Sequence, residues 1–150
     1  MCFSLIDKIS ILTKFIGVVM VIDGFKGRTV CIGDKVRVYR NLNNGKWSIK
    51  AISGEYKNKV VAHLDCLTLQ DVTFVISDAG RARVIREGRK NVHAYAVGFL
   101  KANDEITRSD DNEVITYDPY RCGFFYALDN SDEAIDHIPT LLFSNGKAFI

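Results

Sequence analysis

Features that would indicate a zinc protein or a secreted disulfide protein are missing from this sequence. Its four cysteines, Cys2, Cys31, Cys66 and Cys122, contain no CxxC pair, and its three histidines are also far apart. A zinc site needs clustered thiolate and imidazole ligands, so this spacing does not predict one. We therefore expect no metal and reduced cysteines, as in a cytoplasm.

Catalytic motifs are absent as well. There is no Walker loop and no GxGxxG, HExxH or GxSxG pattern. His63 and Cys66 lie three residues apart in AHLDC, a spacing that places them on opposite faces of a strand. We therefore expect a binding protein, with no enzymatic activity and no cofactor.

No hydrophobic run is long enough to cross a membrane. The opening MCFSLIDKISILTKFIGVVMVIDGF is interrupted by charged residues such as Asp7 and Lys14, and its uninterrupted part, 15–22, is far shorter than a bilayer requires. No signal-peptide cleavage pattern follows it. Two interpretations of residues 1–19 stay open: an amphipathic N-terminal helix, or an upstream extension of a chain whose translation starts at Met20.

The net charge is small, +2, but its distribution along the chain is uneven. Residues 1–101 contain 17 Lys and Arg against 8 Asp and Glu, whereas residues 102–136 contain 10 acidic residues against 2 basic ones. This split predicts a basic side that can meet an anion and an acidic side that faces water or another protein.

What the sequence does contain is mainly the pattern of antiparallel strands. β-branched and aromatic residues flank Asn43-Asn44-Gly45, and the same arrangement surrounds Asn145-Gly146 near the C-terminus. An Asn-Gly pair accepts the positive φ of a tight hairpin turn, so both segments predict hairpins. Between them, KVVAHLDCLTLQDVTFVIS predicts two further short strands.

One helix interrupts the strands. Ser77 or Asp78 can cap its start, and Gly88 can adopt the left-handed conformation that ends it. NVHAYAVGFL then predicts a strand with an aromatic face and a face of small residues that permits close packing. The expected fold class is α+β: a mostly antiparallel β meander with one main helix at about 78–88 and, under the first interpretation of the N-terminus, an N-terminal helix.

The stretch REGRKNVHAY, residues 86–95, concentrates groups that can bind a nucleotide. Guanidinium groups match phosphate oxygens, an Asn amide can read a base or ribose edge, and an aromatic ring can stack on a base. The candidate residues are Arg86, Arg89 and Lys90 for phosphate, Asn91 for a base or ribose edge, Tyr95 or Phe99 for stacking, and His93, Tyr117, Tyr120 and Arg121 in a second rank.

These groups also have a structural explanation. Cations near a helix C-terminus interact favourably with the helix dipole, and rings on alternate strand positions usually belong to a core. Five cations between Arg81 and Lys90, against Asp78 and Glu87, are more than a helix dipole requires. We therefore favour the hypothesis of an anion site.

Four runs of this sequence resemble a family of small proteins encoded by phages and prophages. They are VYRNLNNGKWSI, VVAHLDCLTLQDVTF, SDAGRARVIREGRKNVHAYAVG and, more loosely, ITYDPYR. The resemblance covers about residues 36–126, and the block AGRxRVxREGRKNVHAY is its most specific part. This block is similar to the first Thoeris anti-defence family, whose members sequester the cyclic ADP-ribose isomers made by bacterial TIR-domain immune proteins.

The resemblance implies a phage-encoded, β-rich homo-oligomer in the cytoplasm of an infected bacterium. It would bind a cyclic ADP-ribose isomer, or a cyclic oligonucleotide, without cleaving it. Residues 20–150 would then form a single α+β nucleotide-binding domain after an N-terminal extension, 1–19. Two alternatives stay open: a phage nucleic-acid-binding module that uses the same basic groups, and an inhibitor that blocks a host protein with the acidic face of residues 102–136.

Overall fold

The computed structural model describes residues 13–16, 19–89, 92–101, 113–144 and 146–150. This part of the chain contains thirteen strands, one α-helix and one short 3-10 helix. The strands are β1 (Thr13–Ile16), β2 (Val19–Asp23), β3 (Thr29–Cys31), β4 (Lys35–Arg40), β5 (Trp47–Ala51), β6 (Val60–Leu64), β7 (Cys66–Ile76), β8 (Ala94–Lys101), β9 (Val114–Thr116), β10 (Phe125–Ala127), β11 (Asn130–Ile135), β12 (His137–Ser144) and β13 (Lys147–Phe149). The helices are η1 (Phe25–Gly27) and α2 (Asp78–Glu87).

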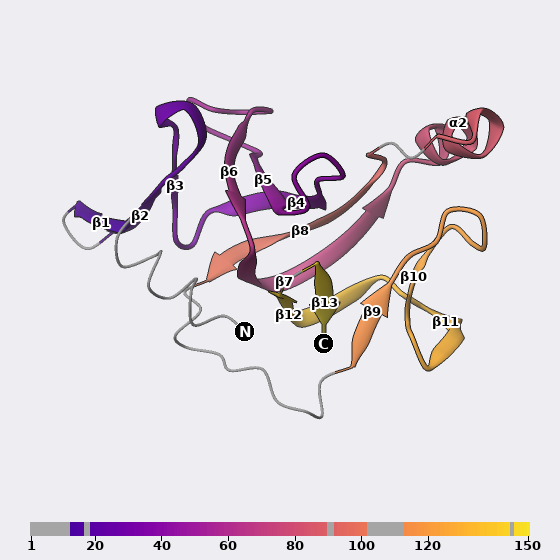
Figure 1. The fold of residues 1–150 in the computed structure, drawn as a ribbon. Helices are drawn as coiled ribbons and strands as arrows, with labels where there is room; N and C mark the ends of the chain where they lie inside the picture. The colour runs from indigo at the N-terminus through magenta and orange to yellow at the C-terminus, as the bar shows by residue number, and fades with distance from the viewer. Residues whose placement is uncertain (1–12, 17–18, 90–91, 102–112, 145) are drawn as a thin grey trace.

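The strands form two antiparallel sheets (Figure 1). A small sheet has the order β1-β2-β3, and a ten-stranded sheet has the order β11-β10-β9-β13-β12-β7-β8-β4-β5-β6. Trp47 of β5 and Phe143 of β12 have ring centroids 4.4 Å apart, although three strands separate β5 from β12 in the sheet. The large sheet therefore curls over and encloses its own core.

The core lies inside this curl because each central strand turns alternate side chains toward it. Val36 and Val38 of β4 are 1% exposed, whereas their neighbours on either side face outward or are only partly buried. Ile49, Leu69 and Leu141, from β5, β7 and β12, have no exposed surface. Burial of each such side chain contributes about 1.5–3 kcal/mol to folding, so these residues hold the curl closed.

Helix α2 follows β7 and precedes β8 in the chain, and it lies at one end of the sheet (Figure 1). The Ser77 hydroxyl accepts a hydrogen bond from the Gly80 amide at 3.1 Å, and Gly88 ends the helix with φ 66°. Both caps are those expected from the sequence. Val84 is the only buried residue of the helix itself, however, so α2 contributes little to the core.

The α+β prediction is wrong as a description of the whole fold. Within the described residues α2 is the only α-helix, and it makes no layer against the sheet, so the protein is a β-rich fold. The strands are antiparallel as expected, yet their order is not that of a meander, because β7 pairs with β12 and β8 pairs with β4. These pairings join strands that are far apart in the chain, and they bury apolar surface that hairpins between consecutive strands would leave exposed.

The N-terminal helix is also not observed where the structure describes this segment. Thr13–Ile16 and Val19–Asp23 form the paired strands β1 and β2, and β2 continues onto β3. The segment is rich in Ile and Val, which favour strands over helices, and this propensity outweighs the helical spacing of its charges. Residues 1–12 and 17–18 lie outside the described part.

His63 of β6 belongs to a polar network at one edge of the sheet. Its Nδ1 lies 2.7 Å from the hydroxyl of Ser48, which has no exposed surface and which accepts a hydrogen bond from the Asn41 amide at 3.1 Å. The Phe25 ring packs edge-on against the imidazole. Partial burial, and then the positive charge of Lys46, lower the pKa of His63 below its ordinary value of 6.5.

We expect acidification to destabilise the protein through His63. Its pKa is lower in the folded than in the unfolded state, so its contribution is complete above pH 6.5 and is lost as the pH falls through the folded-state pKa. Urea unfolding at neutral pH and below pH 6 measures this loss. A His63→Gln variant, which cannot be protonated, should lose less stability on acidification, and an equal loss would contradict the prediction.

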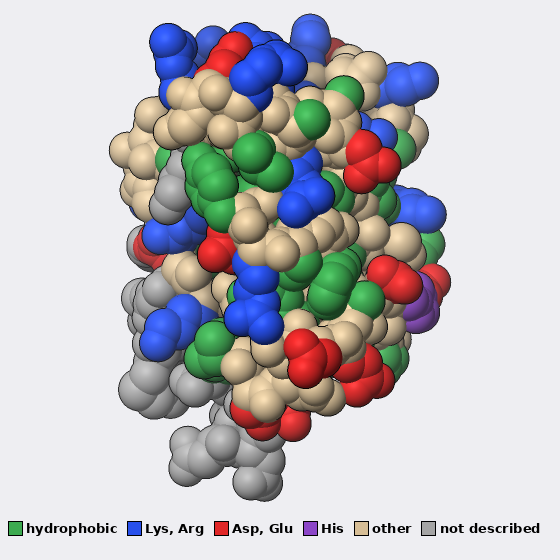
Figure 2. All heavy atoms as spheres, turned by 90° about the vertical axis from the view of Figure 1, so that its right-hand side faces the viewer, with side chains coloured by type: hydrophobic (Ala, Val, Ile, Leu, Met, Phe, Trp, Pro, Cys, Tyr) green, Lys and Arg blue, Asp and Glu red, His purple; other side chains and the backbone are tan. Residues whose placement is uncertain are grey.

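Charged side chains of both signs lie on the surface of the described residues. On the face shown in Figure 2, most Asp and Glu side chains gather in the lower half, whereas Lys and Arg are more frequent above. Among the described residues, no helix has the length and hydropathy needed to span a bilayer.

Candidate ligand-binding site

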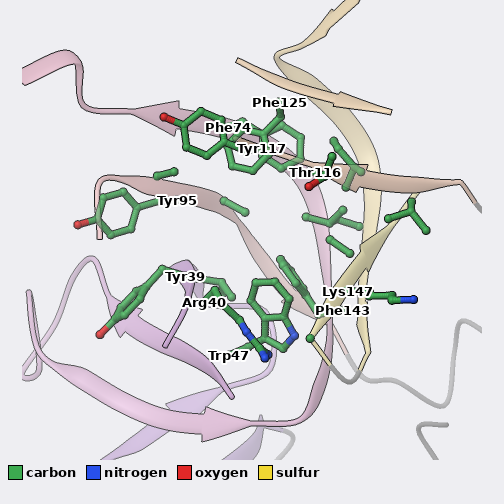
Figure 3. A pocket seen from close by; sticks show the side chains of 18 residues that line it. Tyr39, Arg40, Trp47, Phe74, Tyr95, Thr116, Tyr117, Phe125, Phe143 and Lys147 are labelled. Atoms are coloured by element: carbon green, nitrogen blue, oxygen red, sulfur yellow. The ribbon is translucent and has the colours of Figure 1, made fainter. Parts of the chain in front are cut away.

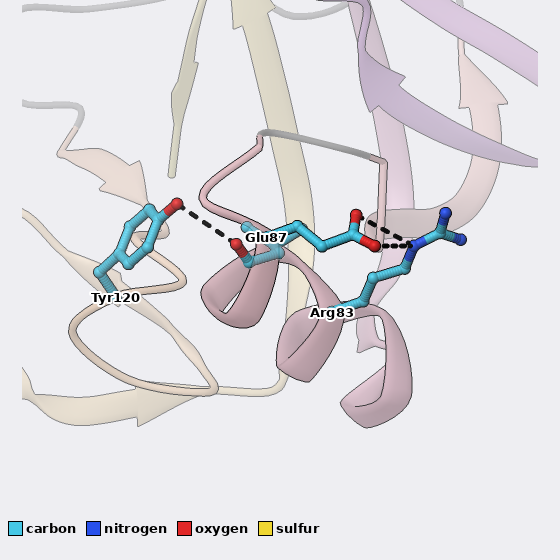
Figure 4. A network of polar contacts seen from close by, with 4 residues as sticks. Arg83, Glu87 and Tyr120 are labelled. Carbon is cyan, nitrogen blue, oxygen red and sulfur yellow. Dashed lines mark hydrogen bonds and ion pairs between the residues drawn. The ribbon is translucent and has the colours of Figure 1, made fainter.

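The basic groups singled out on α2 and just after it lie at the rim of the molecule. Arg86 and Arg89 are exposed. Arg83 forms an i,i+4 ion pair with Glu87, with a closest nitrogen-to-oxygen distance of 3.3 Å (Figure 4). Lys90 and Asn91, although predicted as ligand groups, lie outside the described residues. The assignment of phosphate binding to this cluster therefore stays a prediction.

A pocket of about 290 Å³ lies on the inner side of the curled sheet. Residues of β4, β5, β7, β8, β9, β10, β12 and β13 line it, so strands from both halves of the sheet meet there. Its volume is at the lower end of the range for small-molecule sites. Arg86 and Arg89 do not line it.

Aromatic rings form two sides of this pocket (Figure 3). On one side, Phe74 and Phe125 stack with centroids 4.4 Å apart, and Tyr117 follows Phe125 at 5.1 Å. On the other side, Trp47 packs against Phe143. The distances and tilts are those of favourable aromatic contacts, so the rings are held rigidly and present flat surfaces to a ligand.

Two hydrogen-bond donors in the pocket have no acceptor. Arg40 lies beside the Trp47 ring, with its guanidinium carbon 5.5 Å from the ring centroid (Figure 3). Arg40 Nη1 and Trp47 Nε1 are both buried, and neither has a hydrogen-bond partner among the described residues. A buried donor left unpaired costs about 1–3 kcal/mol, so the pair is better satisfied when an acceptor enters the pocket.

Gly146 leaves room for the Arg40 side chain. A Cβ at position 146 would lie 2.9 Å from one terminal nitrogen of Arg40, and the φ of Gly146 is 86°. The turn between β12 and β13 therefore passes directly against the guanidinium group. A larger residue at this turn would displace the cation from its place beside the Trp47 ring.

Of the predicted residues, Tyr95 and Tyr117 line the pocket, and His93 contacts Tyr117 without lining the pocket. His93 is 6% exposed, and its Nε2 lies 2.8 Å from the Tyr117 hydroxyl. Burial raises the pKa of Tyr117, an effect that Arg81 opposes and nearby acidic groups reinforce. The phenol therefore stays neutral at physiological pH and keeps a fixed orientation at the edge of the pocket.

The remaining predicted residues lie elsewhere. The Phe99 ring is 38% exposed, with the Lys35 ammonium 5.7 Å from its centroid. Tyr120 is 52% exposed and makes a long hydrogen bond of 3.5 Å to the Val84 carbonyl (Figure 4). Arg121 is exposed and lies over the Tyr126 ring. The structure thus places two of the ten predicted residues, Tyr95 and Tyr117, in the lining of one pocket.

The pocket also contains residues that the sequence analysis missed, above all Arg40 and Trp47. Their signal was present, because a hairpin that turns at Asn43-Asn44-Gly45 pairs position 40 with position 47, as observed. Phe74 and Phe125 carried no such signal, since β7 and β10 are neither adjacent in sequence nor paired. Only the curl of the sheet brings their rings into contact.

The lining of the pocket combines aromatic rings, aliphatic side chains and the cations Arg40 and Lys147. Among the described residues, its lining contains no Asp, Glu, His or Cys side chain. No group of three or more such side chains is placed to hold a metal ion anywhere in the described part of the chain. The lining provides flat aromatic surface, the cations of Arg40 and Lys147, and the indole of Trp47.

Comparison with known proteins identifies the family. The family model described as Mycobacterium phage L5 gene 82 protein matches residues 29–149, which include every strand that lines the pocket. The chain belongs to the L5 gene 82 protein family. The Gene 82 protein of Mycobacterium phage L5 is 35% identical over 92 residues, which are 57% of this chain and 71% of that protein. No solved structure matches the chain significantly.

Membership of the gene 82 family confirms that the sequence resembles a phage protein. The matched segment, 29–149, includes the small strand β3 and the whole ten-stranded sheet. The anti-defence role that the resemblance implied stays a prediction, as do the absence of enzymatic activity and the homo-oligomer.

Proposed function

We propose that this gene 82 family protein binds a small nucleotide in the aromatic pocket and holds it unchanged. The observation that carries the proposal is the pair of buried, unpaired donors on Arg40 and Trp47, two residues that line a pocket rich in aromatic rings. A nucleotide combines the two features that such a pocket recognises, namely a flat ring that stacks and anionic oxygens that accept hydrogen bonds.

The arrangement of these side chains favours recognition of the base of a nucleotide on one side of the pocket and of its phosphate on the other. Phe74, Tyr117 and Phe125 offer ring faces and edges, while Arg40 supplies charge next to Trp47. A guanidinium group inside a pocket is screened less than one on the surface, so its interaction with phosphate is stronger there than at Arg86 or Arg89. A small shift of the Arg40 side chain would turn its free N–H toward the ligand.

The resemblance to the Thoeris anti-defence family narrows the ligand to a cyclic nucleotide immune signal, in particular a cyclic ADP-ribose isomer. A phage protein gains from removing such a signal from the host cytoplasm without any chemical step, because tight binding alone lowers its free concentration. The pocket lining supports binding through its aromatic rings and the cations Arg40 and Lys147. The expected homo-oligomer belongs to the same proposal.

A panel experiment tests the proposal. The protein is incubated with cyclic ADP-ribose isomers, linear ADP-ribose, ADP and cyclic di- and trinucleotides, separated from free ligand, and heated. Chromatography of the released material should return one panel member chemically intact. An altered product would show an enzyme, and no retained member would contradict nucleotide binding. Protein denatured before incubation is the control for non-specific retention.

A further inference from the structure

A second surface adjoins the pocket along β4 and β8. On β4, Lys35, Arg37 and Tyr39 alternate with the buried valines and therefore point outward. Strand pairing places Phe99 of β8 opposite Lys35, and Lys50 of β5 opposite Arg37. With Tyr95, whose ring is 5.9 Å from that of Tyr39, these six residues form a surface that we call the basic aromatic face.

Cations and rings are interleaved on the basic aromatic face. The Lys35 ammonium is 5.7 Å from the centroid of the Phe99 ring, and the Arg37 guanidinium carbon is 5.8 Å from that of Tyr95. Lys35 and Arg37 are exposed, and the Phe99 ring is 38% exposed. Exposure of a large apolar ring such as Phe99 to water is unfavourable. The same exposure between cations lets the ring stack on a base of a bound nucleic acid.

The charges of the basic aromatic face are not balanced within the sheet. By register, the outward positions of the described parts of β4, β5 and β8 hold no Asp or Glu. Arg37 and Lys50 stand directly opposite each other, an arrangement of like charges that destabilises a sheet. On the neighbouring β7, Asp71 is already bonded to His137 at 2.6 Å. This unbalanced positive charge is complementary to a polyanion.

We propose that the basic aromatic face binds single-stranded nucleic acid. Lys35, Arg37 and Lys50 neutralise backbone phosphates, and unpaired bases stack on Phe99 and the neighbouring rings. The side chains are spaced along β4 by two residues, roughly 6.5 Å, so successive cations follow an extended strand rather than a compact ligand. A duplex hides its base faces, which removes the stacking contribution. Tyr39 and Tyr95 also line the pocket, but the three cations and Phe99 do not. The inference therefore does not depend on the nucleotide proposal.

Fluorescence anisotropy with an end-labelled oligothymidylate of about ten nucleotides tests this inference. Binding by the full chain should weaken about 20-fold between about 50 and about 200 mM salt, as expected for three phosphates neutralised on a single strand. A triple variant, Lys35→Gln, Arg37→Gln and Lys50→Gln, should bind the oligonucleotide at least about 20-fold more weakly than the wild type at low salt. Phe99→Ala should lose about tenfold, through stacking. Equal thermal unfolding midpoints confirm that the variants fold.

The matched control removes two cations from α2 and one just after it instead, with Arg83→Gln, Arg86→Gln and Arg89→Gln. It should bind the oligonucleotide within about twofold of the wild type, since exposed charges beyond a Debye length are screened. Four results would overturn the inference: no binding by the wild type, an equal loss in the control, equal affinity for a duplex of the same length, or dissociation of a dimer by Phe99→Ala. The last would show that a second copy of the chain covers this face. Arg40→Met should leave oligonucleotide binding unchanged.

Discussion

Replacement of Arg40 by Met is expected to weaken nucleotide binding about 10- to 100-fold without loss of stability. A hydrogen bond to a charged group contributes about 1.5–3 kcal/mol, and each 1.4 kcal/mol is about tenfold in affinity. Met has a similar length and fills the same space beside Trp47, but it has no N–H to leave unpaired. Removing the unpaired Nη1 offsets the lost cation–π contact, so the free energy of unfolding should stay within about 1 kcal/mol or rise. Titration calorimetry with the nucleotide retained in the panel, and urea unfolding, measure the two quantities.

Arg86→Met is the informative comparison for this experiment. The sequence predicts that Arg86 holds phosphate, whereas the structure places its side chain on the surface away from the pocket. We expect the Arg86→Met variant to bind the nucleotide with the affinity of the wild type. A large loss in Arg86→Met together with none in Arg40→Met would locate the anion site at the end of α2 and reject the pocket.

Replacement of Leu69 by Ala is expected to lower the free energy of unfolding by about 2–5 kcal/mol. Leu69 is fully buried at the centre of β7, between Leu100 of β8 and Leu141 of β12. Its truncation leaves a cavity where the two halves of the curled sheet meet, and neighbours on paired strands cannot move in to fill it. Such a loss is a large part of the roughly 5–15 kcal/mol that stabilises a domain. Equilibrium urea unfolding at constant pH measures it.

Leu128→Ala removes the same atoms from an exposed site and serves as the control. Leu128 is 65% exposed in the turn after β10, so its truncation should change stability by less than about 0.5 kcal/mol. Similar losses in the two variants would show that Leu69 does not lie in a packed core, and would place the sheet curl in doubt.

Features set by neighbouring residues were predicted well from the sequence. The hairpin at Asn43-Asn44-Gly45 joins β4 to β5, and Ser77 and Gly88 begin and end the helix at the expected places. Each depends on the φ and ψ preferences and side-chain hydrogen bonds of a few adjacent residues. The small face of β8 is likewise confirmed, since a Cβ at Gly98 would lie 2.9 Å from the Gln70 carbonyl oxygen of β7.

The predicted site was less complete, for a reason that concerns distance along the chain. Clusters of cations stand out in a sequence, and the sequence therefore favours Arg86 and its neighbours as the anion site. A single Arg40 with Trp47 seven positions later forms no recognisable motif, although the predicted hairpin pairs the two residues. Which cation is buried depends on what packs over it, here the turn at Gly146 from the far end of the chain.

The amino-acid sequence by itself determined the antiparallel strands, their turns, the caps of α2 and the uneven charge, because local conformational preference and alternation act within about ten residues. It also contained the phage family relationship. Only the tertiary structure decided the order of the ten strands, the curl that brings β5 against β12, and the pocket inside it. These depend on which apolar faces can be buried together across the whole chain, and no short segment contains that information.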